Sequence, residues 1–84
     1  MTRDEIAAGV TAFIRENFIF DDRTTLRAGD SLIQSGTVDS TGILELIAFI
    51  ERTYAVRFED AELTAENFDS VDRITSCVAG KLGA

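Results

Sequence analysis

Apolar residues return at helical spacing along three stretches of the chain. The first stretch covers residues 2–18, where a repeat of three or four positions predicts an amphipathic helix. Thr2 and Glu5 have the spacing of a capping box, in which each side chain accepts a hydrogen bond from a backbone N–H at the helix start. The face expected to be buried consists of Ile6, Val10, Phe13 and Ile14.

The second stretch predicts a helix over residues 40–53. Asp39 directly precedes it and is the expected N-cap, because a carboxylate accepts hydrogen bonds from the unpaired N–H groups of a first turn. Successive residues turn by about 100°, which gives this helix one apolar side. That side carries Ile43, Ile47, Ile50 and Tyr54, with Leu46 beside them. The opposite stripe carries Thr41, Glu45, Ala48 and Arg52.

Two more helices are predicted in the last third of the chain. Thr64 is placed to cap a short helix over residues 65–68, after a connection that contains one short turn. Ser70 is placed to cap a longer helix over residues 71–82, in which apolar residues again repeat at helical spacing and after which Gly83 follows. The core residues expected from this part are Phe68, Val71, Ile74 and Val78.

Residues 19–38 show no helical repeat and are rich in Asp, Thr, Ser and Gly, which favour turns and loops. A connection of this length indicates either an incorrect assignment or a functional loop. The residues expected to hold it against the core are Leu26, Leu32, Ile33 and Val38. The whole pattern predicts an all-α fold, a single domain over residues 1–84. We expect a small four-helix bundle with three main helices, one short helix and a long loop between helices 1 and 2.

The 84 residues include no His and a single Cys. This composition excludes a His-based catalytic triad, a Cys/His zinc site and an internal disulfide. No metal site is expected, since Asp21, Asp22 and Asp30 also lack the spacing of a calcium-binding EF-hand loop. A lone Cys is typical of a reducing compartment, so we expect a cytoplasmic protein. Cys77 is expected to be a buried packing residue rather than a reactive thiol. Tyr54 and the six Phe residues are expected to lie in the core or to anchor loops.

Acidic residues outnumber basic ones by 15 to 8, which gives a formal net charge of −7. This charge repels phosphate backbones and argues against nucleic-acid binding, whereas it favours partner proteins with basic surfaces. The excess is larger after residue 37, where it forms either a solvated surface or a docking surface. No apolar run approaches the roughly 20 residues that a membrane-spanning helix needs, so no membrane partner is expected.

Ser40 is the residue of greatest chemical interest. It lies at the first position of the second predicted helix, where free N–H groups and positive partial charge would stabilise an attached anion. Covalent addition of a phosphate-containing group is therefore chemically reasonable at this hydroxyl. From helix chemistry alone, an ordinary polar residue in a first turn explains the position at least as well.

A wider pattern surrounds this serine. It consists of Asp39-Ser40 and Leu44-Glu45-Leu46, with Asp30-Ser31-Leu32-Ile33 and Ser35-Gly36 upstream and residues 63–68 before Ser70 downstream. With these motifs the chain resembles acyl and peptidyl carrier proteins over nearly its whole length. The resemblance implies that Ser40 receives 4′-phosphopantetheine from coenzyme A through a separate phosphopantetheinyl transferase. The thiol of this group then holds cargo as a thioester, so the prosthetic group supplies the chemistry and the chain is not itself an enzyme.

The resemblance also implies partners and site residues. An acyl or aminoacyl ligase would load the carrier, downstream acyl-transferring enzymes would use it, and the carrier itself would be a monomer. Next to Ser40, Asp39 would place magnesium and coenzyme A or would only cap the helix, and Thr41 and Gly42 would adjoin the arm. Gly42 would leave the surface beside the arm uncluttered or would be a tolerated helix glycine. The expected partner-binding residues are Leu44, Glu45, Ala48 and Glu51.

Several of these roles have alternatives. Leu44 is either an apolar anchor for partners or a residue packed against the long loop, and Glu51 is either a partner contact or part of a solvated face. Thr41 and Gly42 replace the large apolar residue and the acid common in fatty-acid carriers, and Arg52 interrupts the acidic second helix. These departures favour a free-standing carrier of a dedicated pathway, with fatty acyl, polyketide or amino-acid-derived cargo. A shallow apolar space between the helices is expected and would shelter such cargo.

Two other functional classes remain open. The chain would also suit an unmodified acidic helical adaptor that binds a basic partner through its second helix. An enzyme with Ser40 as nucleophile is disfavoured, because the chain has no His and no spacing links Lys81 or a carboxylate to Ser40 as a base. Replacement of Ser40 separates the carrier from the adaptor.

Overall fold

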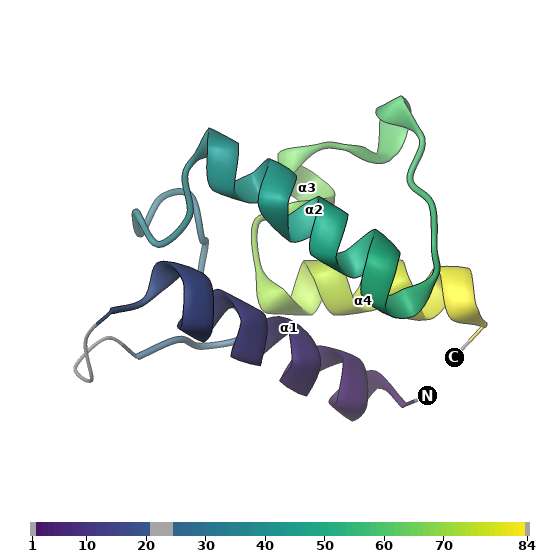
Figure 1. The fold of residues 1–84 in the computed structure, drawn as a ribbon, viewed down its shortest axis with the longest axis horizontal. Coiled ribbons are helices and arrows are strands. Elements are labelled where there is room, and N and C mark those ends of the chain that lie inside the picture. Colours follow the sequence, from purple (N-terminus) through teal and green to yellow (C-terminus); the bar gives the residue numbers. More distant parts are fainter. Residues whose placement is uncertain (1, 21–24, 84) are drawn as a thin grey trace.

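The chain folds into a small helical bundle whose two termini lie at the same end (Figure 1). The structure is a computed structural model, and it describes residues 2–20 and 25–83. Within those ranges there are four α-helices, one 3₁₀ turn and no strand, which confirms the predicted all-α fold. The elements in chain order are α1 (Arg3–Phe18), α2 (Ser40–Tyr54), η1 (Asp60–Glu62), α3 (Ala65–Phe68) and α4 (Val71–Leu82).

Local capping accounts for the ends of the long helices. At α1, the Thr2 hydroxyl accepts from the Glu5 N–H at 3.2 Å and the Glu5 carboxylate accepts from the Thr2 N–H at 3.0 Å. These hydrogen bonds confirm the predicted capping box, and the bond that the Glu5 carboxylate accepts from Thr2 lowers the pKa of Glu5 below its ordinary value. At α4, the Ser70 hydroxyl accepts from the Arg73 N–H at 3.1 Å. Gly83 ends the helix in the left-handed region, with φ of 72°.

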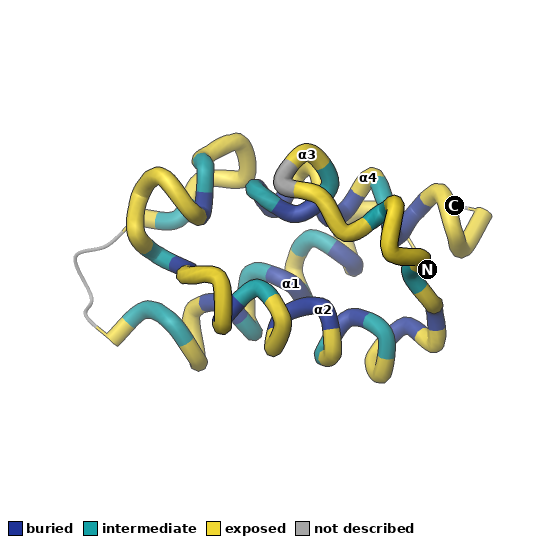
Figure 2. Tube along the Cα trace, turned by 90° about the horizontal axis from the view of Figure 1, so that it is seen from above, coloured by how far each residue is buried: buried dark blue, intermediate teal, exposed yellow. Residues whose placement is uncertain are grey.

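The core lies where the apolar faces of α1, α2 and α4 meet, and buried positions recur along all three helices (Figure 2). Tyr54 at the end of α2 donates from its hydroxyl to the Ile6 carbonyl of α1 at 3.3 Å. The predicted core residues are buried with two exceptions, Phe13 and Ile43, which are only partly covered at the edge of the core. Phe13 instead stacks on Phe49, with ring centroids 4.1 Å apart. The core also contains Val56 and Ala79, which were not predicted.

The long connection between α1 and α2 is fastened to the start of α4 through Asp69. The Asp69 carboxylate accepts from the Ser31 hydroxyl at 2.7 Å and from the Ile33 N–H at 3.0 Å. The Asp69 carbonyl accepts from the Leu32 N–H at 2.7 Å, and the Leu32 carbonyl in turn accepts from the Val38 N–H at 3.1 Å. Residues 31–38 therefore hold a defined course that leads directly into the first turn of α2.

This fastening decides which apolar loop residues reach the core. Leu32 and Val38 are buried as predicted, and Leu26 is partly buried. Ile33 is 46% exposed, so the expectation that it anchors the loop is wrong. Its backbone N–H is held by Asp69 immediately after the buried Leu32, and the chain turns at this point so that the Ile33 side chain is left outside.

Replacement of Asp69 by Asn tests the loop fastening. The hydrogen bonds from Ser31 and Ile33 hold the pKa of Asp69 below its ordinary value, so this carboxylate stabilises the fold above about pH 4 and the contribution is lost as the pH falls through its folded pKa. We expect Asp69→Asn to lower the free energy of unfolding by about 1 kcal/mol at pH 7. We also expect this variant to lose less stability than the wild type between pH 5 and pH 2, in urea unfolding curves.

A matched control is Asp60→Asn. Asp60 is exposed and its side chain makes no hydrogen bond within the described residues, so this change should leave the stability at pH 7 nearly unchanged. Equal losses of stability on acidification in the wild type and the Asp69 variant would contradict the role given to Asp69.

Candidate functional site

Ser40 is the first residue of α2 and its side chain is exposed. The preceding Asp39 has extended backbone angles, and its carboxylate accepts from the Gly42 N–H at 2.7 Å, which confirms the predicted N-cap. The Ser40 hydroxyl makes no hydrogen bond to any residue that the structure describes. An accessible hydroxyl oxygen is thus presented at the positive end of a capped helix, where an attached phosphate is electrostatically favoured.

The outward face of α2 has the composition that the helical wheel predicted. Thr41, Glu45, Ala48 and Arg52 are all exposed. Leu44 is 66% exposed, so it does not pack against the long loop, and it stands one turn from Ser40 as an uncovered apolar side chain. This arrangement agrees with the alternative in which Leu44 is an anchor for a partner.

Glu51 has a structural contact that the sequence did not indicate. Its carboxylate accepts a hydrogen bond from the Phe58 N–H at 3.0 Å and is partly buried. The contact ties α2 to the chain that leaves it, beyond the left-handed Ala55 with φ of 55°. Glu51 therefore has fewer free acceptor positions for a partner than the exposed Glu45.

Gly42 is buried, which corrects the expectation that it keeps the surface beside Ser40 uncluttered. A Cβ at this position would lie 2.8 Å from Phe18 Cε1 and 2.8 Å from Val38 Cγ1. Close packing of the first turn of α2 against α1 and the loop, rather than open space, is thus the reason for a residue without a side chain. Thr41, by contrast, faces solvent beside Ser40.

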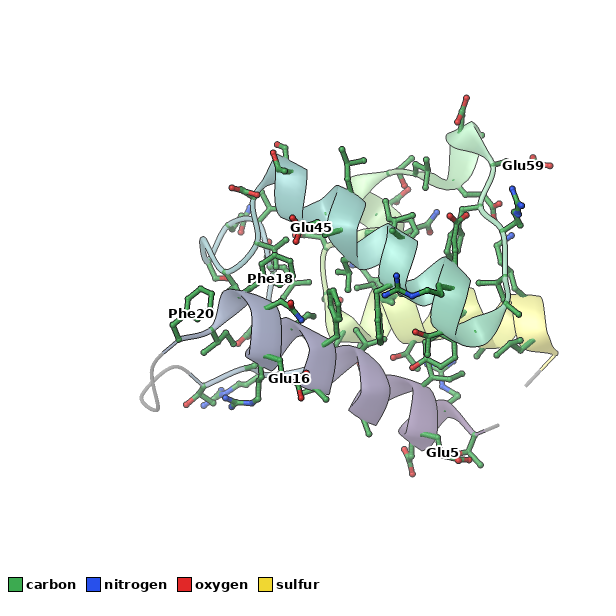
Figure 3. All side chains as sticks on the ribbon, in the orientation of Figure 1. Glu5, Glu16, Phe18, Phe20, Glu45 and Glu59 are labelled. Atoms are coloured by element: carbon green, nitrogen blue, oxygen red, sulfur yellow. The ribbon has the colours of Figure 1, made fainter. Side chains whose placement is uncertain are left out.

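A hollow of about 370 Å³ opens between the end of α1 and the first turns of α2. Phe20 at its margin is 85% exposed, which corrects the expectation that every Phe is a core or loop anchor. In Figure 3, Phe18 and Phe20 lie at the end of α1 and Glu45 lies on α2. The sequence offered no signal for this position, because an aromatic residue just after a helix is usually buried. The lining residues are Asn17, Phe18, Phe20, Gly36, Thr37, Asp39, Thr41, Gly42 and Glu45.

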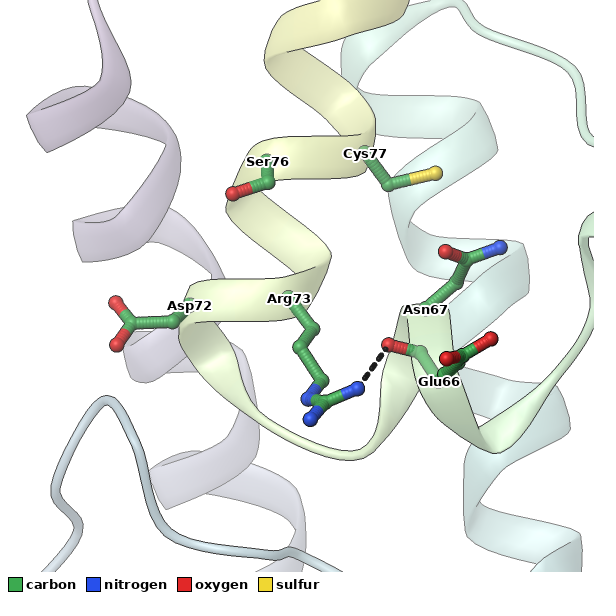
Figure 4. Close-up of a pocket in the computed structure, with 6 residues that line it drawn as sticks. All are labelled: Glu66, Asn67, Asp72, Arg73, Ser76 and Cys77. Carbon is green, nitrogen blue, oxygen red and sulfur yellow. Dashed lines mark hydrogen bonds between the residues drawn. The ribbon is translucent and has the colours of Figure 1, made fainter.

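Two other hollows lie away from Ser40. The one beside α3 and α4 has a volume of about 390 Å³ and is lined by polar residues and Cys77, with Arg73 donating to the Glu66 carbonyl at 3.0 Å (Figure 4). The one at the end of α2 has a volume of about 480 Å³ and is flanked by Arg52 and Arg57. None of these three hollows is the apolar space that was expected between the helices. Close-packed side chains fill the interior, and Leu46, for example, has no exposed surface.

Cys77 is partly exposed beside the first of these hollows, which corrects the expectation that it is buried. Burial, and secondarily the nearby Glu62 carboxylate, raises the pKa of its thiol above the ordinary value. The less reactive protonated thiol is therefore favoured at neutral pH.

Two kinds of feature are absent from residues 2–20 and 25–83, a membrane-spanning helix and a cluster of metal-binding side chains. In those ranges no helix has both the length and the apolar character to cross a bilayer. No group of three or more Cys, Asp or Glu residues there is arranged to hold a metal ion. Of the three acids considered for calcium, Asp21 and Asp22 lie outside the described residues.

No model of a known protein family matches the chain, and no curated protein matches it. A function must therefore be inferred from the chemistry around Ser40 and from the resemblance in the motifs on either side of it.

Two helical glycines make a matched test of the packing under Ser40. We expect Gly42→Ala to lower the free energy of unfolding by roughly 1–2 kcal/mol, because the new methyl group would collide with Phe18 and Val38. Gly80 lies on the exposed side of α4, with nothing within 4 Å of a Cβ, so Gly80→Ala should raise stability by about 0.5–1 kcal/mol. Urea unfolding of both variants measures the difference, and equal stabilisation by the two changes would rule out the close contact at Gly42.

Proposed function

We propose that this chain is a carrier protein whose Ser40 bears 4′-phosphopantetheine and presents thioester-bound cargo to the enzymes of a biosynthetic pathway. The observation that carries the proposal is the exposed, unengaged Ser40 hydroxyl at the first residue of a helix capped by Asp39. The exposed Leu44 and Glu45 beside it support the proposal, because a carrier must offer a surface to its partners as well as an attachment point.

The residues around Ser40 fit the prosthetic group. Modification forms a phosphate ester at the Ser40 oxygen, with loss of the hydroxyl proton and release of the nucleotide part of coenzyme A. The helix start offers positive partial charge to this phosphate, and the Asp39–Gly42 hydrogen bond holds the turn in place. When bound, the group supplies a thiol that holds cargo as a thioester. Since the chain has no His, we assign the transfer to a separate phosphopantetheinyl transferase.

The cargo is assigned only by class, as a fatty acyl, polyketide or amino-acid-derived group. An acyl or aminoacyl ligase would supply it and a downstream acyl-transferring enzyme would remove it. The net charge of −7 suits partners with basic docking surfaces, which would approach the outward face of α2 quickly and bind it briefly. We propose that the carrier acts as a cytoplasmic monomer, since brief contacts with several enzymes require a free surface.

Intact mass spectrometry tests the attachment. The protein is incubated with coenzyme A, magnesium and a transferase of broad specificity, beside the variants Ser40→Ala and Ser76→Ala. We expect the wild type and the Ser76 variant, which removes an exposed serine on α4, each to gain the mass of one phosphopantetheine, and the Ser40 variant to gain none.

Failure of a folded wild-type protein to gain mass would refute the carrier proposal. The leading function would then be an unmodified acidic adaptor, because the exposed Leu44 and Glu45 on α2 also suit stable binding of a basic partner. An adaptor would keep its partner affinity on Ser40→Ala, whereas a carrier would lose its cargo.

The two roles considered for Asp39 are separable by substitution. Asn caps a helix as well as Asp does, so Asp39→Asn should keep the stability, whereas Asp39→Ala should lose about 1 kcal/mol. We expect the Asn variant to be modified more slowly, by about tenfold or more, because the charge that would help to place magnesium and coenzyme A is gone. Unfolding curves and the rate of mass gain measure the two effects, and an unchanged rate in the Asn variant would leave Asp39 as a cap alone.

A further inference from the structure

The chain contains few side chains that can attack an acyl group. It has no His, one Cys and one Lys, and the other seven of its eight basic residues are Arg. Lysine is ordinarily among the commonest residues of a soluble domain. Arginine supplies positive charge without a nucleophile, because its guanidinium stays protonated, whereas a neutral lysine amine attacks activated acyl groups. Lys81 is therefore the one side-chain amine of this chain that a thioester could acylate.

Lys81, near the end of α4, is held in a contact with two partners. Its Nζ atom lies 2.9 Å from Glu62 Oε1 and 5.2 Å from the centre of the Phe58 ring. This is the only ion pair within residues 2–20 and 25–83, and the Lys81 side chain is 25% exposed. To attack a carbonyl, the amine has to lose its proton and leave both the carboxylate and the aromatic face. The contact opposes each of these steps, because both partners attract the charged form.

The Glu62 carboxylate is itself fixed in position. Its Oε1 atom also accepts from the Glu59 N–H at 2.8 Å, and its backbone carbonyl accepts from the Asn67 side-chain amide at 2.8 Å. The Glu59 N–H, and after it the Lys81 ammonium, lower the pKa of Glu62 below its ordinary value. Glu62 is therefore ionised at neutral pH and already in place to receive the charge of Lys81.

The same carboxylate acts on a second nucleophile of α4. Cys77 lies one turn before Lys81 on this helix. Burial raises the pKa of the Cys77 thiol and the charge of Glu62 raises it further, while the charge of Lys81 lowers it. The thiolate rather than the thiol takes an acyl group from a thioester. The surroundings of Glu62 thus disfavour attack by the amine and by the thiol alike.

We propose that Glu62 protects thioester-bound cargo from transfer to the carrier's own Lys81. In the reaction that it opposes, the neutral amine attacks the thioester carbonyl, a C–N bond forms and the C–S bond breaks. The sulfur leaves as a thiol with the proton that the nitrogen loses. The amide product is not returned to a thiol by thioester exchange, so each such event removes one acyl group from the pathway. The role rests on the carrier function proposed above, and the acyl donor is the chain's own arm or that of a second copy.

A first test needs no prosthetic group. The unmodified protein is incubated with the small thioester S-acetyl-N-acetylcysteamine, and peptide mass spectrometry follows acetylation of Lys81 separately from that of the N-terminal amine. Glu62→Gln keeps the size and an acceptor oxygen of the side chain but removes its charge. We expect Lys81 to be acetylated about two- to fivefold faster in this variant than in the wild type. N-acetyl-lysine amide in the same solution is the reference amine, and wild-type Lys81 should react more slowly than this compound.

The matched control is Glu16→Gln. It removes the charge of one exposed glutamate on α1 (Figure 3), so it changes the net charge equally and should leave the rate at Lys81 unchanged. Equal rates in the wild type and the Glu62 variant would overturn the proposal. Equal acceleration by the two variants would overturn it as well, because the effect would then come from net charge rather than from the contact.

A second test uses the carrier loaded with an acetyl group through Ser40. Hydroxylamine cleaves thioesters but not amides, so acetyl groups that remain on the protein after this treatment report transfer to an amine. Glu62→Gln should retain about two- to fivefold more acetyl on Lys81 than the wild type after the same time. The variant Lys81→Arg should retain none at this position.

The two tests separate the protective role from the carrier function. If Ser40 is never modified, the carrier function fails and the protective role fails with it, whatever the first test shows. If Ser40 is loaded but Glu62→Gln retains no additional acetyl on Lys81, the protective role is wrong and the carrier function stands.

Discussion

The burial of the apolar faces of α1, α2 and α4 against one another is the constraint on which the rest of the structure depends. Ile6, Ile14, Leu46, Ile50 and Ile74 have no exposed surface. In a chain of 84 residues this one core supplies most of the apolar burial, and helices as short as these are marginal without it. Every other feature, including the course of the long loop, is attached to this frame.

The site depends on the frame through hydrogen bonds as well as through the burial of loop residues such as Val38. Asp69 at the start of α4 binds the loop at Ser31, Leu32 and Ile33, and the buried Val38 then brings the chain to Asp39. The cap at Asp39 sets the first turn of α2. These hydrogen bonds and the buried Val38 therefore transmit the position of the core to Ser40, whose hydroxyl makes no hydrogen bond to any described residue.

The surface around Ser40 combines exposed apolar side chains, which a protein usually covers, with an exposed acidic side chain. Leu44 and Phe20 are apolar yet open, and Glu45 has an acidic side chain without a described cation. A protein that does not bind other proteins would not require these exposed apolar groups. Their placement on either side of one helix end is what connects the proposed carrier with recognition by other proteins.

The sequence by itself determined the helices and the candidate attachment residue. The caps at Thr2, Asp39 and Ser70 act within one turn, so local spacing was sufficient to predict where three helices begin. The tertiary structure alone decided which side chains are covered. Gly42 packs closely against Phe18 across the α1–α2 contact. Phe20 is exposed, although a Phe side chain is usually buried. A helix cap depends on residues close in the sequence, so the sequence is sufficient to predict it. The exposure of a side chain depends on residues distant in the chain, so only the tertiary structure decides it.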